Sequence, residues 1–471
     1  MVINHLIMKL IKKKILILLC IVINCHFFAS CDEKNEGSSL KPNPFNNSSD
    51  SSILNVKYTS NADTLFLTWK LLSDTIDFDF FQVSLNGSAE VVKVNSNINS
   101  CFLTHVPYNK VIPVSISLVN NEEIIKTFKK DVVIDGLDTV FARILIPDKG
   151  SVTGGDGTYS IPLPDGRSIF LMGDSFTGPV TNGVRSKSDH MFRNTYILYD
   201  HGKVTAIFGA KGEKSSAAVP PGVSDESKEW YWPGHGFVDN NTLYIFQTLM
   251  YQAEAGMWGF KYKRTDILEY SLPNIVLQRN MNTPFVGSEN VHFGMAVLKD
   301  NNYVYIYAQK DLNNTGTSIS EALVARTTID NLYEEWEYFN GTGWTSNSSE
   351  AVKMEGLSNV NVSSQFSVFK LQDKYILLTQ EKQLFSGQIY TFVSDNPQGP
   401  WFHKTLIYTT KEQNIPNVYT YNALAHPQFM KDGMVLISYN VNTMDLEQLF
   451  NDAYIYRPRF FWMDIDKILG K

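Results

Sequence analysis

The sequence predicts an all-β protein in which a small β-sandwich over residues 53–137 precedes a five-bladed β-propeller over residues 138–471. Three observations lead to this fold class. Short apolar runs alternate with turn residues along the chain, five copies of one hairpin recur after residue 138, and long helical periodicity is absent. An aromatic content of 13% also favours a chain rich in strands.

The five hairpins decide the architecture of the larger part. Each has a strand, a tight polar turn and a second apolar strand, and successive turns are about 60 to 75 residues apart. A four-stranded blade with its loops needs a length of that order, and five such blades close into a ring. A generic array of sandwiches is the alternative. The turns contain Asp165, Asp239, Asp300, Asp373 and Asp432.

Strand patterns at residues 64–69, 78–85 and 111–118 predict the sandwich. With Trp69 on an early strand and Tyr108 before a late one, this stretch resembles a fibronectin type III domain. We expect it to act as a spacer, and sugar binding is the alternative.

Residues 1–30 are expected to be a lipoprotein signal peptide. Lysines precede an apolar run at 15–28 that is short for a membrane span, and the run ends at Ala29-Ser30-Cys31. This ending resembles a bacterial lipobox, which implies that Cys31 is acylated; an ordinary signal peptide or a signal anchor is the alternative. The acidic cluster that follows resembles Bacteroidetes export tags, which implies an outer-membrane lipoprotein exposed at the cell surface. We predict that residues 31–52 form a flexible tether.

Charge and cysteine content exclude several classes of function. Acidic residues outnumber basic ones by 48 to 41, so nucleic acid is not an expected partner. Of the four cysteines, two lie in the signal peptide, Cys31 would carry lipid, and Cys101 would be alone. Neither a disulfide framework nor a cysteine-based metal site is therefore expected. We expect a monomer.

Residues that flank the innermost strands should converge on one central pocket, because these strands begin near the propeller axis. Each blade carries polar or charged side chains there, where a merely structural propeller would use small or apolar fillers. The sequence therefore predicts a binding pocket on the axis. Its candidates are Asp156, Asp174, Trp232, His235, Glu289, His292, Gln365, Glu381 and His426.

Residues 155–175, 232–236 and 456–460 resemble a group of Bacteroidetes lipoproteins that carry the domains of unknown function numbered 4185 and 5005. That group is similar to five-bladed glycoside hydrolases such as family 43, and the segments 394–401 and 438–440 resemble phrases of those hydrolases. The resemblance implies a polysaccharide or oligosaccharide substrate, with arabinose-containing or other furanoside glycans among the choices.

Glycosidic bond cleavage usually needs two carboxyl groups, one as acid and one as base or nucleophile. The resemblance implies Asp156 as the base; a local role in a Gly-rich turn is the alternative. Asp174 follows an apolar strand, so it is expected to be either functional or hydrogen-bonded in the structure. Glu289 and Glu381 are the candidates for the acid. Here the chain departs from family 43, because His235 stands where that family has its second acid and the segment 363–365 stands where it has its general acid. The general acid cannot be carried over, so a retaining or an inverting mechanism stays open.

The histidines His235, His292 and His426 could bind a metal, contact sugar hydroxyls, or pack in the core. By resemblance, His426 faces a central water or calcium site, so Ca²⁺ in the axis is possible. Trp232, with its two aromatic neighbours, could stack on sugar or pack in the core. Arg457 is expected to reach a carboxylate of the protein or the substrate. A non-catalytic glycan-binding lipoprotein, which would need no matched acid and base, is the competing function.

Overall fold

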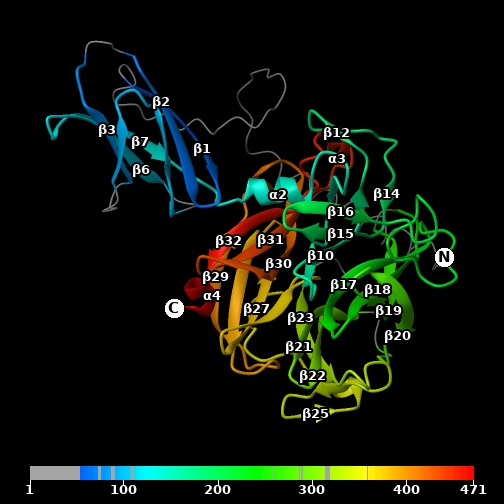
Figure 1. Ribbon diagram of the computed structural model, residues 1–471. Coiled ribbons are helices and arrows are strands. Elements are labelled where there is room, and N and C mark those ends of the chain that lie inside the picture. Colours follow the sequence, from blue (N-terminus) through cyan, green and yellow to red (C-terminus); the bar gives the residue numbers. More distant parts are fainter. Residues whose placement is uncertain are drawn as a thin grey trace, which may run out of the picture. The chain divides into compact units, whose positions relative to one another are not determined.

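The computed structural model describes residues 54–471, apart from 73–75, 86–90, 108–110, 257, 286, 288–289, 313–318, 358 and 384. The predicted signal peptide and tether, together with Cys31, Tyr108 and Glu289, therefore lie outside the described residues. Nearly all of the regular secondary structure in the described chain is β-strand (Figure 1). No helix in this part is long and apolar enough to cross a membrane.

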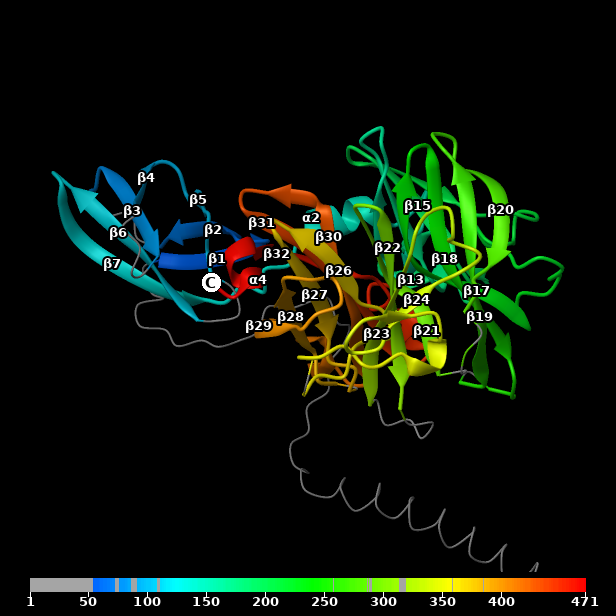
Figure 2. The same cartoon turned by 90° about the horizontal axis from the view of Figure 1, so that it is seen from below.

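Seven antiparallel strands form a sandwich of two sheets, with the orders β1-β2-β5 and β4-β3-β6-β7 (Figure 2). Alternate residues of β2 are buried, and Trp69 meets the edge of Phe81 at 5.1 Å between ring centroids. Cys101 lies in the same core, where burial raises the pKa of its thiol to about 11. The three predicted strand patterns are confirmed as β2, β3 and β6. The strands are β1 (Leu54–Asn61), β2 (Thr64–Leu71), β3 (Phe80–Leu85), β4 (Val91–Asn95), β5 (Ser100–Leu103), β6 (Ile112–Asn120) and β7 (Glu123–Val132).

The remainder of the described chain forms a five-bladed propeller. The first strand of each blade contacts the first strand of the next, so β9, β17, β21, β26 and β30 close a ring around the axis. Blade I has β9 (Tyr159–Pro162), β10 (Ser168–Met172), β15 (Thr195–Asp200) and β16 (Lys203–Ile207). Blade II has β17 (Glu229–Asp239), β18 (Thr242–Gln252), β19 (Phe260–Ser271) and β20 (Val276–Asn282). Blade III has β21 (Val291–Asp300), β22 (Tyr303–Asp311), β23 (Ser320–Thr327), β24 (Glu337–Phe339) and β25 (Trp344–Thr345). Blade IV has β26 (Ser367–Leu371), β27 (Lys374–Gln380), β28 (Gln388–Ser394) and β29 (Phe402–Thr409), and blade V has β30 (Val418–Lys431), β31 (Met434–Thr443) and β32 (Arg459–Asp464).

All five predicted hairpins are confirmed as the two innermost strands of the five blades. Their turns contain residues with positive φ, such as Asn240 at 50° and Asn301 at 53°. Tight hairpin turns require that backbone region, which glycine and asparagine adopt most easily. The turn chemistry thus made the hairpins visible in the sequence.

The ring is closed by a segment that precedes blade I. Leu137 forms an antiparallel bridge with Phe461 of β32, and the Asp138 amide donates to the Phe460 carbonyl at 2.7 Å. This segment takes the place of a fourth, outer strand in blade V, which has only three named strands. The Asp138 carboxylate then caps helix α2 (Thr139–Leu145) and accepts a hydrogen bond from the Trp462 indole at 2.8 Å. Residues more than 300 apart in the sequence are joined in this way.

A second, smaller sheet lies beside the hairpin of blade I and has the order β14-β11-β8. It joins the segments immediately before β9 and immediately after β10, which both carry site candidates. Its strands are β8 (Gly154–Gly155), β11 (Ser175–Phe176) and β14 (Met191–Phe192). The remaining short elements are β12 (Val180–Thr181), β13 (Val184–Arg185), η1 (Ser348–Glu350), η2 (Glu412–Asn414), α3 (Gln448–Asn451) and α4 (Ile465–Leu469).

Candidate functional site

Asp156 and Asp174 lie side by side on blade I. Strand β8 pairs with β11, so that Gly155 faces Ser175, and each aspartate is next to one member of that pair. The Asp156 amide donates to the Asp174 carbonyl at 3.3 Å, and the Gly173 amide donates to the Asp156 carbonyl at 2.7 Å. A Cβ at Gly173 would lie 2.5 Å from Asp156 Oδ1, so any larger residue there would force the Asp156 carboxyl to shift. The local sequence is therefore built to bring the two carboxylates together.

The Asp156 carboxyl is surrounded by tyrosines from blade V and its return loop. The Tyr421 hydroxyl donates to Asp156 Oδ2 at 2.5 Å, and Tyr456 also hydrogen-bonds to this carboxyl. Burial, and secondly the charge of Asp174, raise the pKa of Asp156 to about 7, and the tyrosine hydrogen bonds oppose the rise only in part. Asp156 therefore exchanges its proton near neutral pH.

The Asp174 carboxylate has a different set of partners. Its Oδ1 accepts a hydrogen bond from the Trp232 indole at 2.9 Å, and its Oδ2 lies 3.4 Å from Nη1 of Arg193. Burial raises the pKa of Asp174, while the positive charge of Arg193 and these two hydrogen bonds oppose that rise. The side chain is still 19% exposed. Arg193 thus favours the ionised form of Asp174, whereas the described side-chain partners of Asp156 are the tyrosines Tyr421 and Tyr456.

Two buried arginines hydrogen-bond to Thr153, in the backbone segment that leads to Asp156. Arg457 donates to the Thr153 carbonyl at 2.9 Å and to Asp148 at 2.9 Å. Arg185 donates to the hydroxyl of Thr153 at 2.7 Å and to its carbonyl at 3.1 Å. Arg457 thus reaches a protein carboxylate, one of the two outcomes expected for it, and its guanidinium supports the segment that leads to Asp156.

The other predicted carboxylates are not brought to this pair by any described contact. Glu381 follows β27 of blade IV, where its oxygens accept hydrogen bonds from the Asn361 amide at 3.1 Å and side chain at 2.9 Å. It also accepts one from the amide of Gln383 at 3.2 Å. Glu289 lies outside the described residues. Of the four predicted carboxylates, the structure thus brings Asp156 and Asp174 together, and their catalytic role stays a prediction.

Two of the predicted histidines lie inside the ring of innermost strands. His426 is fully buried between the hydroxyls of Ser160, at 2.7 Å, and Ser438, at 2.9 Å. His235 accepts from the Val297 amide at 3.1 Å through Nδ1, and its Nε2 lies 3.4 Å from the Ser160 carbonyl. Burial lowers the pKa of His235 to about 4 and that of His426 to about 3, so both are neutral. They tie blades together, as the core alternative expects.

A calcium ion in the axis, which the resemblance made possible, does not fit these residues. Both ring nitrogens of His426 are occupied by hydroxyl groups, so the ring presents no lone pair to an ion. Among the described residues, no group of three or more His, Cys, Asp or Glu could hold a metal. We therefore derive no chemistry through a cation.

Three further candidates lie at the axis or beside it. The Gln365 side chain donates to the Pro233 carbonyl at 3.2 Å and accepts from Asn422 at 3.2 Å, which links blades II, IV and V. His292 stacks on Tyr262 with 4.3 Å between ring centroids. Trp232 binds Asp174 through its indole N–H, so it belongs to the site itself.

Sequence reasoning missed three residues of the site, namely Arg193, Tyr421 and Tyr456. The two tyrosines lie next to segments that were already marked, since Tyr421 directly precedes 422–426 and Tyr456 begins the segment 456–460. Arg193 carried no such signal. Its guanidinium lies 4.1 Å from the centroid of the Trp230 ring, which positions it toward Asp174.

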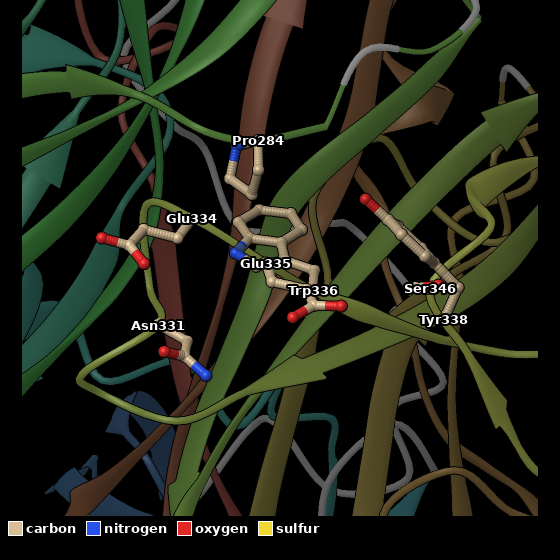
Figure 3. Close-up of a pocket in the computed structure, with 7 residues that line it drawn as sticks. All are labelled: Pro284, Asn331, Glu334, Glu335, Trp336, Tyr338 and Ser346. Carbon is tan, nitrogen blue, oxygen red and sulfur yellow. The ribbon is translucent and has the colours of Figure 1, made fainter.

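Two described clefts lie away from the axis. Figure 3 shows one of about 420 Å³, which Trp336 and Tyr338 line together with Glu334 and Glu335. Both aromatic side chains are buried, and the Trp336 indole donates to the Leu332 carbonyl at 2.9 Å, so they belong to the core of blade III. The other cleft, of about 730 Å³, is lined in part by Arg193, whose Nη1 lies 3.4 Å from Asp174 Oδ2.

Comparisons with known proteins agree with this fold. The family described as Domain of unknown function (DUF5005) matches residues 138–464. A solved structure from Bacteroides ovatus ATCC 8483, provisionally described as a hydrolase, is 22% identical with a TM-score of 0.59, and the match covers 69% of this chain and 89% of that one. A family 117 glycoside hydrolase from Zobellia galactanivorans is 10% identical with a TM-score of 0.40 over 68% and 86% of the two chains. A family 32 β-fructofuranosidase from Bombyx mori is 13% identical with a TM-score of 0.38 over 67% and 60%. No curated protein matches the chain.

Proposed function

The chain belongs to the DUF5005 family, whose description names no activity, and we propose from its site that it is a glycoside hydrolase that uses Asp156 and Asp174. The observation that carries this proposal is the pair itself. Two adjacent carboxyl groups lie in different electrostatic surroundings, one with a pKa near 7 and the other beside a cation. Hydrolysis of a glycosidic bond uses one protonated and one ionised carboxyl group, and this pair is suited to both roles.

We assign the role of proton donor to Asp156. Its raised pKa keeps a large fraction protonated near neutral pH, so it can protonate the oxygen of the leaving sugar. Asp174, which Arg193 favours in the ionised form, would act on the opposite side as base or nucleophile. The resemblance to family 43 implied the base at Asp156, so this assignment reverses that expectation. In the free protein both the protonated and the ionised form of Asp156 are populated at pH 7.

The neighbouring side chains would orient the pair. Trp232 fixes one oxygen of Asp174 through its indole N–H, and Tyr421 fixes one oxygen of Asp156. Each carboxylate therefore keeps its second oxygen in a defined direction. Preorganisation of this kind is what an acid–base pair needs, since small displacements of the reacting groups are costly in rate.

Asp156→Asn and Asp174→Asn test the proposal on a panel of furanoside and pyranoside polymers. Each variant should lose activity by about 10²- to 10⁴-fold, the usual contribution of a positioned acid or base. Asp165→Asn is the matched control, because Asp165 lies in the turn at the other end of the same hairpin and is 38% exposed on its side chain. Full activity of either site variant would contradict the proposal.

A glycan-binding protein without catalysis is the second candidate. The observation in its favour is Gln365, an amide held by Pro233 and Asn422 where the family 43 resemblance calls for an acid. Under that function the wild-type protein would bind a polymer without releasing new reducing ends. Reducing-end assays on the same polymers distinguish the two functions.

We also propose that Cys31 is acylated and anchors the protein in the outer membrane, with the sandwich acting as a spacer. The lipobox-like sequence and the acidic cluster after it support this location. Metabolic labelling with palmitate should label the wild-type protein and not Cys31→Ser. Mass spectrometry that finds an unmodified N-terminus further along the chain would contradict it.

A further inference from the structure

A row of aromatic side chains leads outward from Asp174 over blade II. Trp232, whose indole binds Asp174, lies 4.9 Å from Phe260 between ring centroids, and Phe260 lies 6.3 Å from Trp258. Trp258 ends the row and is 62% exposed. Phe260 begins β19, and Trp258 lies in the loop that joins β18 to β19. The row thus runs from the site to open solvent.

The loop that carries Trp258 is braced by hydrogen bonds. The Gln252 side chain donates to the carbonyls of Glu254 and Gly256 at 2.6 and 2.7 Å. The amides of Ala253 and Glu254 both donate to the Gly259 carbonyl, at 2.8 and 2.9 Å. A large exposed indole on an ordered loop has little conformational entropy to lose when it binds a ligand.

A second row leads outward from Asp156 over blades V and IV. Tyr421, whose hydroxyl binds Asp156, lies 5.4 Å from Tyr419 between ring centroids, and Tyr419 lies 6.3 Å from Phe385. Phe385 ends this row and is 47% exposed. It lies in the β27–β28 loop, where the hydroxyl of Ser386 donates to the Glu381 carbonyl at 3.3 Å.

The two rows begin on the two members of the carboxylate pair and diverge over the two neighbours of blade I. Blades II and V flank blade I in the ring, because β17 and β30 both contact β9. Exposed aromatic surface linked to a polar site indicates a ligand with both apolar and hydroxylated faces. The C–H faces of sugar rings stack on aromatic rings, while their hydroxyls bind polar groups.

We propose that the two rows are subsites for one extended glycan, which lies across the Asp156–Asp174 pair with sugar units on both sides of it. The chemical consequence of this inference rests on the proposed function. A hydrolase with such subsites cuts internal bonds of a polymer rather than removing single terminal sugars. The contacts at Trp258 and Phe385 bind the sugar units farthest from the reacting bond. A site for one terminal sugar would need neither exposed ring.

Affinity gel electrophoresis tests the binding part with the full chain carrying Asp156→Asn, so that the polymer is not consumed. The gels contain arabinan, arabinogalactan, arabinoxylan, levan or xylan. Trp258→Ala and Phe385→Ala should each lower the affinity for the retained polymer, measured from the retardation, by about three- to tenfold, as expected for the loss of one stacking contact. Phe402→Ala is the matched control, because Phe402 is a 36% exposed aromatic residue on the outer strand β29. It should leave retardation unchanged.

The outcomes separate this inference from the proposed function. Loss of affinity in both variants supports the two-sided site, whereas an effect of only one variant, of neither, or no retardation by any of the polymers overturns it. With the active wild-type protein, early products longer than one sugar unit support internal cleavage, and release of single sugars alone overturns it. Retardation that depends on both residues in a protein without hydrolytic activity would refute the proposed function and leave the extended binding site standing.

Discussion

Relative to the wild type, Asp156→Asn should gain stability as pH rises from 5 to 8, while it lowers activity. In the folded protein the pKa of Asp156 is about 7, against 3.8 for the free side chain. The folded state therefore holds this proton more tightly than the unfolded state, and the wild-type free energy of unfolding falls as pH rises from about 4 to about 7. Asparagine does not titrate, so the variant escapes this loss and can still accept the Tyr421 hydrogen bond.

The magnitude follows from the interval between the two pH values compared. From pH 5 to the folded-state pKa near 7, a loss of about 1.4 kcal/mol per pH unit amounts to roughly 2.5 kcal/mol. The stability of Asp156→Asn relative to wild type should therefore increase by that order between pH 5 and pH 8, and level off above pH 7.

Urea denaturation of both proteins at pH 5, 6, 7 and 8 measures this difference. Asp165→Asn is the control, because the Arg167 hydrogen bond lowers the pKa of Asp165. Its stabilising effect is present above the unfolded pKa and is lost only at more acidic pH, so its offset should be constant from pH 5 to 8. A constant offset for Asp156→Asn as well would refute the raised pKa and the proton-donor role that depends on it.

Three further variants test the surroundings of the pair and the axis. Arg193→Met removes the charge that opposes the rise in the pKa of Asp174, so the acidic limb of the kcat/KM profile should move to higher pH; an unmoved limb would exclude Asp174 as the ionised partner. Tyr421→Phe removes a hydrogen bond that lowers the pKa of Asp156, so the basic limb should also move to higher pH, and a shift to lower pH would contradict the assignment. His426→Leu leaves the hydroxyls of Ser160 and Ser438 without this partner and should cost about 2 to 4 kcal/mol in urea denaturation. A Ser160→Ala background should reduce that cost, and the absence of any reduction would argue against the hydrogen bond.

The strands and the carboxylate pair were predictable from the sequence because both are encoded locally. Each hairpin combines apolar alternation with turn residues that accept positive φ, so its two strands are visible within about 15 residues. Asp156 and Asp174 flank the same hairpin, so its pairing alone brings them together.

The partners of the pair could not be predicted in the same way. Tyr421 is 265 residues from Asp156, and their contact depends on how blade V meets blade I. Arg193 is only 19 residues from Asp174, but it lies directly after β14 of the small sheet and is positioned by Trp230. Glu381 shows the opposite case. In the sequence it looked equivalent to Asp174, because it also follows an inner strand, but in the structure it accepts hydrogen bonds from Asn361. Local patterns give the type of residue, and only tertiary contacts decide its partner.

The closure of the ring by Leu137 and Phe461 sets the order in which the site can form. Residues 456–464 supply the last strand of blade V, and the Tyr456 carbonyl accepts the Gly155 amide at 3.0 Å directly before Asp156. Arg457 holds Thr153 in the same segment. A chain still emerging from the ribosome thus lacks the contacts that hold its carboxylate pair until residues 456–464 join the fold. The pair is completed only when these two distant segments meet.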